Sequence, residues 1–253
     1  MLDETKALIF SIVFFFVGGF VFFKGFVWMR QKKLIENIPT SKIRSLAMGL
    51  VEIKGKVLKG EKVLSSPFSS KPCVWYKYKI EEYRKQGKNS RWVTIKHGRE
   101  GVHFKLQDNT DDVLVDPEGA QIDIPQDGQF KSGVGNGAPA MIQQFCDAQG
   151  IRTKGWFFNR QMKYTEYFIE PGDDLYIIGT AGDNPFVDDT TGKKNVDDIM
   201  IQKGKNEKFY YISDKGEKGV LKTLKWKVFG GLAGGAVLML GCLAYMLFYL
   251  GLF

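Results

Sequence analysis

The sequence contains little cysteine and histidine, with three cysteines and two histidines among 253 residues. Cys73 lies in an expected strand, Cys146 in an expected helix and Cys242 in a long apolar run, so no two of them are placed to form a disulfide. This excludes a disulfide-rich secreted domain, and the free thiols fit a reducing compartment.

Phosphate-binding motifs are also missing. The sequence has no GxxxxGK[ST] pattern, and residues 133–139, GVGNGAP, share only the glycines of a phosphate loop. No hydrophobic strand precedes this segment and no Lys-Ser/Thr pair follows it, so we interpret it as a flexible loop. We therefore expect no bound cofactor.

Acidic residues gather at one place in a chain whose formal net charge is +8. Five carboxylates lie within residues 104–122: Asp108, Asp111, Asp112, Asp116 and Glu118. A calcium loop that began at Asp108 would need glycine at its sixth position and glutamate at its twelfth, where the chain has Val113 and Gly119. Asp/Asn-rich segments between two short apolar strands are typical of tight turns, so we expect neither a metal site nor a catalytic carboxylate pair.

Each end of the chain carries a long apolar run. Residues 7–29 are apolar apart from Ser11 and Lys24, and residues 228–253 contain no charged side chain. About 20 helical residues cross a hydrocarbon layer roughly 30 Å thick, so both runs predict transmembrane helices. A secretory signal peptide is the alternative for the first run, but its upstream flank is not basic and no cleavage site follows.

Basic residues flank both runs on the side of the central segment, residues 30–227: Arg30, Lys32 and Lys33 after the first run, and Lys222, Lys225 and Lys227 before the second. The positive-inside rule then predicts that this central domain is cytoplasmic and that both termini lie outside. The sequence pI of about 9.2 is explained by anionic lipid head groups beside these residues rather than by nucleic acid.

Glycines in the two runs have the spacing of close helix packing. The pairs Gly230/Gly234 and Gly231/Gly235 have small-xxx-small spacing, and the first run contains Gly18 and Gly19. Packing of one helix against the other is therefore a possible arrangement, although the same spacing is common in transmembrane helices.

The central domain alternates apolar and polar residues over most of its length, which predicts strands. We expect a short helix between Pro39 and Gly49, a hairpin with its tip at residues 84–91, a helix at residues 138–150 and a second hairpin at residues 164–181. The expected fold class is α+β and mainly antiparallel β with two short helices, flanked by the two transmembrane helices. An OB-like barrel is one form that such a sheet could take.

Candidate catalytic residues are few. His97, His103 and Cys73 could belong to an unrecognised enzyme site, but local spacing identifies no partner for any of them, and a cysteine that begins an apolar strand is usually a buried packing residue. Trp75 and the tyrosines that follow it, mixed with lysines, could stack bases, but strand packing explains the same composition, and we expect no nucleic-acid partner.

Four stretches, taken in order, resemble one family: residues 39–57, 65–76, 104–122 and 167–181. They are similar to the GIDE-type domain, also called the BAM ("beside a membrane") domain, of the membrane-anchored mitochondrial ubiquitin ligases. The resemblance covers most of residues 39–181 and includes the layout with two transmembrane helices. The positions that match the family pattern, expected to be structural rather than catalytic, are Pro39, Gly49, Gly55, Pro67, Cys73, Asp108, Asp116, Gly119, Gly172 and Gly179.

In the family's ubiquitin ligases a RING finger after the second transmembrane helix recruits the ubiquitin-conjugating enzyme. A RING binds two zinc ions through eight Cys and His ligands, whereas this chain has five such residues in total and is expected to end within the second transmembrane helix. The resemblance therefore implies a prokaryote-like member without the RING, in a plasma membrane, for which the label of ubiquitin ligase survives only by similarity.

We expect from this a partner-binding or sensing module at the membrane, which contacts lipid through its two transmembrane helices and an unidentified protein through its edge strands and the loop at residues 183–198. The alternatives are an enzyme with an unrecognised site in the β-rich domain and a structural subunit of a membrane complex.

Overall fold

A computed structural model describes residues 2–60, 62–87, 89–153, 160–187, 196–205 and 209–252. The chain divides into two compact units, which are described separately below. One unit consists of Met1–Pro39 together with Lys215–Phe253, and the other of Thr40–Asp214.

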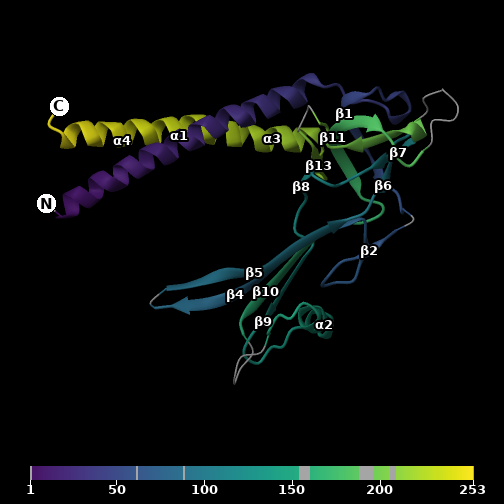
Figure 1. Cartoon of the computed structure of the whole chain (residues 1–253), viewed down its shortest axis with the longest axis horizontal. Coiled ribbons are helices and arrows are strands. Elements are labelled where there is room, and N and C mark those ends of the chain that lie inside the picture. The colour runs from purple at the N-terminus through teal and green to yellow at the C-terminus, as the bar shows by residue number, and fades with distance from the viewer. Residues whose placement is uncertain are drawn as a thin grey trace. The chain divides into compact units, whose positions relative to one another are not determined.

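The first unit is a pair of helices, drawn in purple and yellow in Figure 1. Helix α1 spans Leu2–Asn37, and its partner is a continuous run of α3 (Gly216–Phe229), a π-helical turn η3 (Gly230–Gly234) and α4 (Gly235–Tyr249). Both are long and apolar enough to cross a membrane, over Thr5–Asn37 and Gly216–Tyr249. Helix α1 extends beyond its apolar run at both ends, whereas the second helix begins before its run and ends at Tyr249.

Glycines lie where the two helices approach each other closely. A Cβ atom added to Gly231 would lie 2.8 Å from the Cα of Gly25, and one added to Gly235 would lie 2.9 Å from the carbonyl oxygen of Gly18. A Cβ added to Gly230 would meet no atom within 4 Å. Of the two glycine pairs in the sequence, the structure therefore uses Gly231/Gly235 at the helix contact, because only glycine lets the two backbones approach so closely.

The second unit contains a closed five-stranded barrel, as the OB-like prediction anticipated. Its strands are β1 (Gly49–Val57), β6 (Phe104–Gln107), β7 (Asp112–Val115), β12 (Ile199–Gln202) and β11 (Asp174–Asp183), and pairing of β11 with β1 closes the ring. All neighbours are antiparallel except β7 and β12. Two short strands, β13 (Tyr211–Ser213) and β8 (Gln121–Asp123), continue the sheet from β11.

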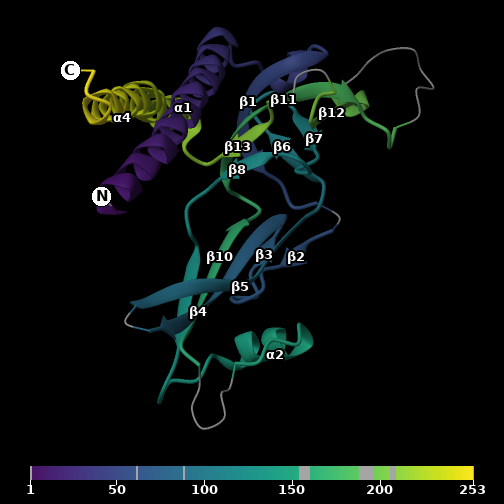
Figure 2. The ribbon, with the colours of Figure 1, turned by 60° about the vertical axis from the view of Figure 1, so that its left-hand side comes forward.

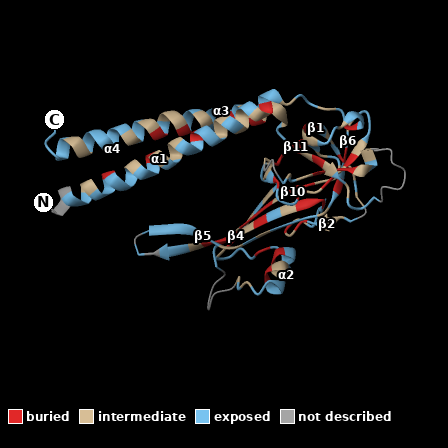
Figure 3. Ribbon diagram, turned by 45° about the horizontal axis from the view of Figure 1, so that its top comes forward, coloured by how far each residue is buried: buried red, intermediate tan, exposed pale blue. Residues whose placement is uncertain are grey.

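Alternation along these strands produces the barrel core, and Figure 3 draws its buried residues in red. In β6, Phe104 and Leu106 are buried while Lys105 and Gln107 are exposed, as expected for a strand with one face toward a core. The same alternation in β7 buries Val113 and Val115. The cluster also includes the fully buried side chains of Ile43, Ile53, Val74, Ile169, Ile177, Ile201 and Ile212.

A second sheet is inserted between barrel strands, in the order β5–β4–β10–β9. A long hairpin of β4 (Trp75–Gln86) and β5 (Asn89–Gly101) precedes β6, while β9 (Gly128–Ser132), helix α2 (Ala140–Ala148) and β10 (Met162–Ile169) precede β11. Figure 2 shows α2 beside this sheet, away from the barrel. A small ribbon of β2 (Leu64–Ser65) and β3 (Pro72–Cys73) completes the unit.

Two expectations from the sequence need correction. The segment between Pro39 and Gly49 forms only a single 3₁₀ turn, η1 (Ile43–Ser45), because the residues after Ser45 already adopt extended backbone. The segment 164–181 is not a hairpin, since β10 pairs with β4 and β9 whereas β11 pairs with β1, β12 and β13.

The turn at Pro171-Gly172 explains this second error. The Gly172 amide donates to the carbonyl oxygen of Val57, and the Val57 amide donates to the carbonyl oxygen of Asp173. The turn is therefore held by the end of β1, and it carries the chain from the inserted sheet into the barrel. The residues Pro171 and Gly172 predict a turn here, but they do not predict which strands will pair with the segments before and after it.

Candidate functional site

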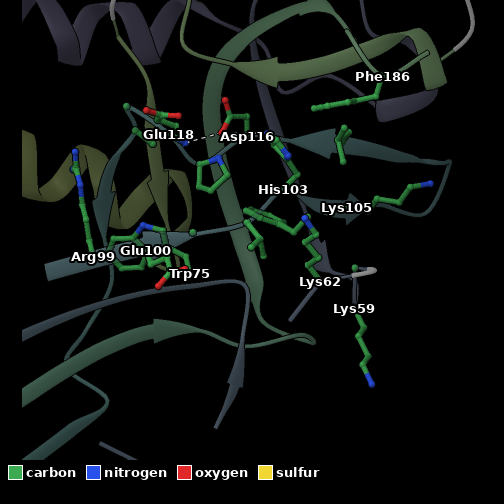
Figure 4. Close-up of a pocket in the computed structure, with 18 residues that line it drawn as sticks. Lys59, Lys62, Trp75, Arg99, Glu100, His103, Lys105, Asp116, Glu118 and Phe186 are labelled. Atoms are coloured by element: carbon green, nitrogen blue, oxygen red, sulfur yellow. Dashed lines mark hydrogen bonds and ion pairs between the residues drawn. The ribbon is translucent and has the colours of Figure 1, made fainter. Parts of the chain in front are cut away.

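A pocket with a volume of about 980 Å³ lies in the second unit, where the inserted segments meet the barrel. Its walls come from the segment after β1, the ends of the β4–β5 hairpin, strands β6 and β7, the turn after β7 and the loop after β11 (Figure 4). This volume is at the upper end of the range for small-molecule sites. In five-stranded barrels of the OB type, ligands bind over strands 2 and 3 and the loops beside them, and β6 and β7 are the second and third strands of this barrel.

The pocket combines apolar and charged walls. Trp75 and Phe104 are buried beneath it, Val102 is half-buried and Phe186 is exposed at its edge. The charged side chains that line it are Lys59, Lys62, Arg99, Glu100, Lys105, Asp116 and Glu118. In Figure 4 the Lys62 side chain reaches toward His103, whereas the Lys59 and Lys105 side chains point away from the centre.

His103 and Asp116 lie close together in this pocket. The His103 Nε2 atom lies 3.7 Å from Asp116 Oδ1, and the His103 ring packs edge-on against Phe186 at 5.1 Å between centroids. Asp116 Oδ1 also accepts the Glu118 amide at 2.9 Å, and the Asp116 carbonyl accepts the Tyr210 hydroxyl at 2.5 Å. These bonds fix the turn after β7 that forms one wall.

Two of the charged side chains are committed to partners outside the pocket. Lys105 Nζ lies 2.7 Å from Asp112 Oδ2, and this hydrogen bond raises the pKa of Lys105. Glu100 Oε2 accepts the Tyr76 hydroxyl at 2.6 Å. Burial, together with that bond, raises the pKa of Tyr76. Lys62 and Arg99 make no ion pair with any residue that the structure describes, so their charges are available to a bound molecule.

Five of the ten positions in the family pattern are glycines whose backbone angles or neighbours leave little room for another residue. Gly49, Gly119 and Gly172 have φ angles of 119°, 75° and 102°, which disfavour other residues. A Cβ on Gly55 would lie 2.4 Å from the Gln107 carbonyl oxygen, and one on Gly179 would lie 2.8 Å from both Ile201 and Tyr210. Two of the ten, Asp116 and Gly119, also line the pocket.

The remaining family positions are scattered. Pro39 precedes the barrel, Pro67 lies in the turn between β2 and β3, and Cys73 is fully buried in β3. Asp108 sits in the β6–β7 turn, where its carboxylate accepts the Thr110 and Asp111 amides, as the turn interpretation predicted. The structure does not gather these residues into one site.

The three candidate catalytic residues do not come together in the pocket. Of Cys73, His97 and His103, only His103 lines it. Burial, with smaller contributions from the charges of Glu166, Glu170 and Glu100, raises the pKa of the Cys73 thiol to about 12. A thiol in this state is a poor nucleophile at neutral pH. Within the described ranges, no group of three or more His, Cys, Asp or Glu residues is placed to hold a metal ion.

Sequence reasoning missed most of the pocket residues. Lys62, Arg99 and Phe186 come from three segments that are distant along the chain, and none of these segments has a motif. Lys and Arg are frequent on any exposed strand or loop, so composition could not select these three. The expected contact loop at residues 183–198 contributes Phe186, while residues 188–195 of that loop lie outside the described residues.

Comparison with known families gives a clear match. The model of the GIDE family, described as an E3 ubiquitin ligase, matches residues 76–246, which is more than half of the chain. The chain belongs to the GIDE family. The matched region begins in β4, runs through the rest of the second unit and ends within α4.

One curated relative is similar over a limited region. A 1,3-alpha-isomaltosidase of Kribbella flavida is 27% identical over 133 residues, which is 48% of this chain and 18% of that protein. The chain thus spans about a fifth of that relative's length, and the similarity transfers no activity to the GIDE protein. No solved structure matches the chain.

Proposed function

We propose that this GIDE protein is a partner-binding or sensing module that two transmembrane helices hold at a membrane. The observation that carries the proposal is the pocket of about 980 Å³ in a unit that the chain places between two apolar helices. Its walls combine buried aromatic surface with the available charges of Lys62 and Arg99, and such a mixture suits selective binding.

We further propose that the residues of this chain do not themselves carry out the ligase chemistry of the family description. RING chemistry requires eight zinc ligands, and the five Cys and His residues here include two fully buried thiols, Cys73 and Cys146. A role in ubiquitin transfer would therefore be indirect, through a partner that the module recruits.

We propose that the second unit, Thr40–Asp214, is soluble, and we call it the soluble unit. The basic flanks of the two helices support a topology with this unit in the cytoplasm of a prokaryotic cell and both termini outside the plasma membrane. Attachment of a membrane-impermeant maleimide to single cysteines at positions 2 and 252, each in a chain in which Cys242 is replaced by serine, tests this orientation in intact cells. Labelling of both from outside supports it, and protection of both contradicts it.

The function is tested by crosslinking and affinity capture from native membranes. The intact chain is compared with a chain in which residues 40–214 are replaced by an inert domain between the same helices. A third chain carries Lys62→Glu and Phe186→Ala, which change the pocket at exposed positions and leave the buried core in place. Partners captured by the intact chain and lost from both others would support recruitment through the pocket.

A catalogue of partners that is identical for the intact chain and the replaced chain would contradict the proposal. Loss from the replaced chain alone would retain recruitment by the soluble unit but assign it to another surface. Stable co-purification of one large complex through the helices alone would favour the structural-subunit alternative.

A further inference from the structure

The four-stranded sheet of the soluble unit has two faces of different character. One face packs against α2, in a cluster that consists of Phe68, Tyr78, Ile80, Ala138, Ile142, Cys146, Met162 and Tyr164. Successive side chains along a strand point to opposite faces, so the neighbours of Tyr78, Ile80 and Tyr164 in each strand belong to the other face.

The strand register places cations side by side on this other face. Lys77 pairs with Arg99 across the β4–β5 hairpin, and Lys163 pairs with Lys131 across β10 and β9. We call this surface the basic sheet face, and define it by Lys77, Lys79, Lys85, His97, Arg99, Lys131 and Lys163. Within these four strands, as far as the structure describes them, Glu81 is the one carboxylate on this face.

The charge of Glu81 is already neutralised. Its two carboxylate oxygens lie 3.0 Å from Lys79 Nζ and 2.7 Å from Lys163 Nζ, and Glu81 is only 7% exposed. Burial alone would raise the pKa of Glu81, but the hydrogen bonds from the two lysines lower it overall. The lysines and arginine that remain, Lys77, Lys85, Arg99 and Lys131, are exposed and leave a net positive surface.

Aromatic rings lie among these cations. The Lys77 ammonium is 5.8 Å from the centroid of the Tyr167 ring, and the Lys163 ammonium is 4.9 Å from that of Trp92. Trp92 also packs against Tyr83 at 5.2 Å and remains 37% exposed. The two lysines therefore cover ring faces that a nucleic acid would need for base stacking. A mixture of Lys, Trp and Tyr is instead typical of protein surfaces in the lipid headgroup region.

We propose that the basic sheet face docks onto the anionic lipid headgroups of the membrane in which the two helices are embedded. Its charge is complementary to an anionic leaflet, which attracts Lys and Arg side chains that lie close to the membrane surface. The chain links the soluble unit to both helices through very short connections, Ile38–Pro39 and Asp214–Lys215. Such a tether gives the headgroups a high effective concentration, so weak contacts suffice.

Docking can be measured on the full chain in reconstituted vesicles. His97→Cys in a Cys242→Ser background places an environment-sensitive fluorophore on the basic sheet face, since Cys73 and Cys146 are buried. A label at Asp147→Cys, exposed on α2, reports the opposite side. Vesicles contain either phosphatidylcholine alone or phosphatidylcholine with phosphatidylglycerol, and a headgroup-attached acceptor dye reports proximity by energy transfer.

The charge requirement is tested with matched triple variants. The face variant carries Lys77→Glu, Lys85→Glu and Lys131→Glu, which reverse the charge at three exposed positions of the basic sheet face. None of these three lysines forms an ion pair with a described residue. The control variant Lys56→Glu, Arg152→Glu and Lys205→Glu makes the same change of charge at exposed positions elsewhere in the soluble unit. Thermal unfolding of each variant identifies loss of the fold.

We expect energy transfer from position 97 to rise at least twofold when phosphatidylglycerol is included, to fall to the neutral-vesicle value in the face variant, and to persist in the control variant. Equal transfer in both vesicle types, or equal loss in both triple variants, would overturn the proposal. A response of position 97 to added single-stranded oligothymidylate and none to phosphatidylglycerol would also overturn it, and would assign the face to nucleic acid. None of these outcomes depends on whether the pocket recruits a partner.

Discussion

The carboxylate of Asp108 accepts the backbone amide of Ile43 at 3.1 Å, which joins two segments that are 65 residues apart in the chain. Its other oxygen accepts the Thr110 amide, the Thr110 hydroxyl and the Asp111 amide within the β6–β7 turn. Asp108 thus closes its own turn and also holds η1 against the end of the barrel. The central carboxylate of the acidic segment therefore makes the hydrogen bonds that the turn interpretation predicts.

Replacing Asp108 by Asn should lower the free energy of unfolding by about 1–2 kcal/mol. An amide keeps the shape of the side chain but removes the charge that strengthens several hydrogen bonds at once. Denaturant unfolding followed by tryptophan fluorescence measures the effect. Asp111→Asn is the matched control, because among the described residues its carboxylate accepts one hydrogen bond, from the neighbouring Asp112 amide, and we expect a smaller loss there. Equal losses in the two variants would contradict the conclusion that Asp108 holds η1 against the barrel.

The same carboxylate predicts a pH dependence. Burial alone would raise the pKa of Asp108, but the hydrogen bonds from Thr110, Ile43 and Asp111 lower it from 3.8 to about 2. Because the folded-state pKa is the lower one, the stabilisation is complete above about pH 4 and is lost as the pH falls toward 2. The difference in unfolding free energy between the parent chain and Asp108→Asn should therefore be constant from pH 5 to 7 and shrink below pH 4. A difference that persists undiminished at pH 2 would show that charge is not responsible.

How much the sequence predicted depends on the range of the interaction. The turn at Asp108 and the apolar helices are local patterns, and the structure contains both. The closed barrel was anticipated only as a general form, and the pairing of β11 with β1 joins residues that are 118 to 132 positions apart. The segment 164–181 was misread for the same reason: Pro171 and Gly172 mark a turn in any context, but only distant partners decide whether its arms pair with each other.

The pocket could not be predicted from the sequence for a related reason. Its cations lie on separate loops and strands, and only the junction of the inserted sheet with the barrel brings Lys62 and Arg99 to one cavity. The basic sheet face could not be predicted either. The sequence shows Lys77 and Lys79 among aromatic residues, but it does not show that they pair with Arg99 and His97 across the hairpin. Tyr76 and Tyr78 point to the opposite face, and Tyr78 packs under α2, so the expected aromatic series is divided between the two faces.

A buried pair inside the soluble unit offers a second stability test. The Tyr176 hydroxyl donates to Glu52 Oε2 at 2.7 Å, and both residues are 1% exposed. Tyr176→Phe removes one donor from a buried carboxylate and should lower the unfolding free energy by about 1–3 kcal/mol. Tyr167→Phe, at a half-buried position on the basic sheet face, is the control and should change it by less than about 0.5 kcal/mol. If both substitutions prove neutral, the Glu52 contact contributes nothing to stability.

The contact between the two apolar helices can be tested with neighbouring glycines. Gly231→Ala would place a methyl group 2.8 Å from the Cα of Gly25, so the helices must separate, at a cost of about 1–3 kcal/mol. Gly230→Ala meets open space and should be neutral or slightly stabilising, because alanine favours helix. Thermal unfolding of the chain in mild detergent, followed by circular dichroism, compares the two. Equal midpoints would mean that Gly231 does not lie at the helix contact in the detergent-solubilised protein.

The buried thiols distinguish a binding module from a cysteine enzyme. Burial raises the pKa of Cys73 to about 12 and that of Cys146 to about 11, and both side chains are inaccessible. Relative to a free cysteine with a pKa of about 8.5, the thiolate fraction of Cys73 at pH 8 should be roughly a thousandfold lower, so iodoacetamide should modify it only after unfolding. Mass spectrometry of tryptic peptides, with and without denaturant, measures this protection.

Rapid modification of Cys73 in the folded chain, together with loss of function in Cys73→Ala at unchanged stability, would support the enzyme alternative. Protection of Cys73, with an unaltered set of captured partners in Cys73→Ala, His97→Ala and His103→Ala, would leave binding as the role of the soluble unit.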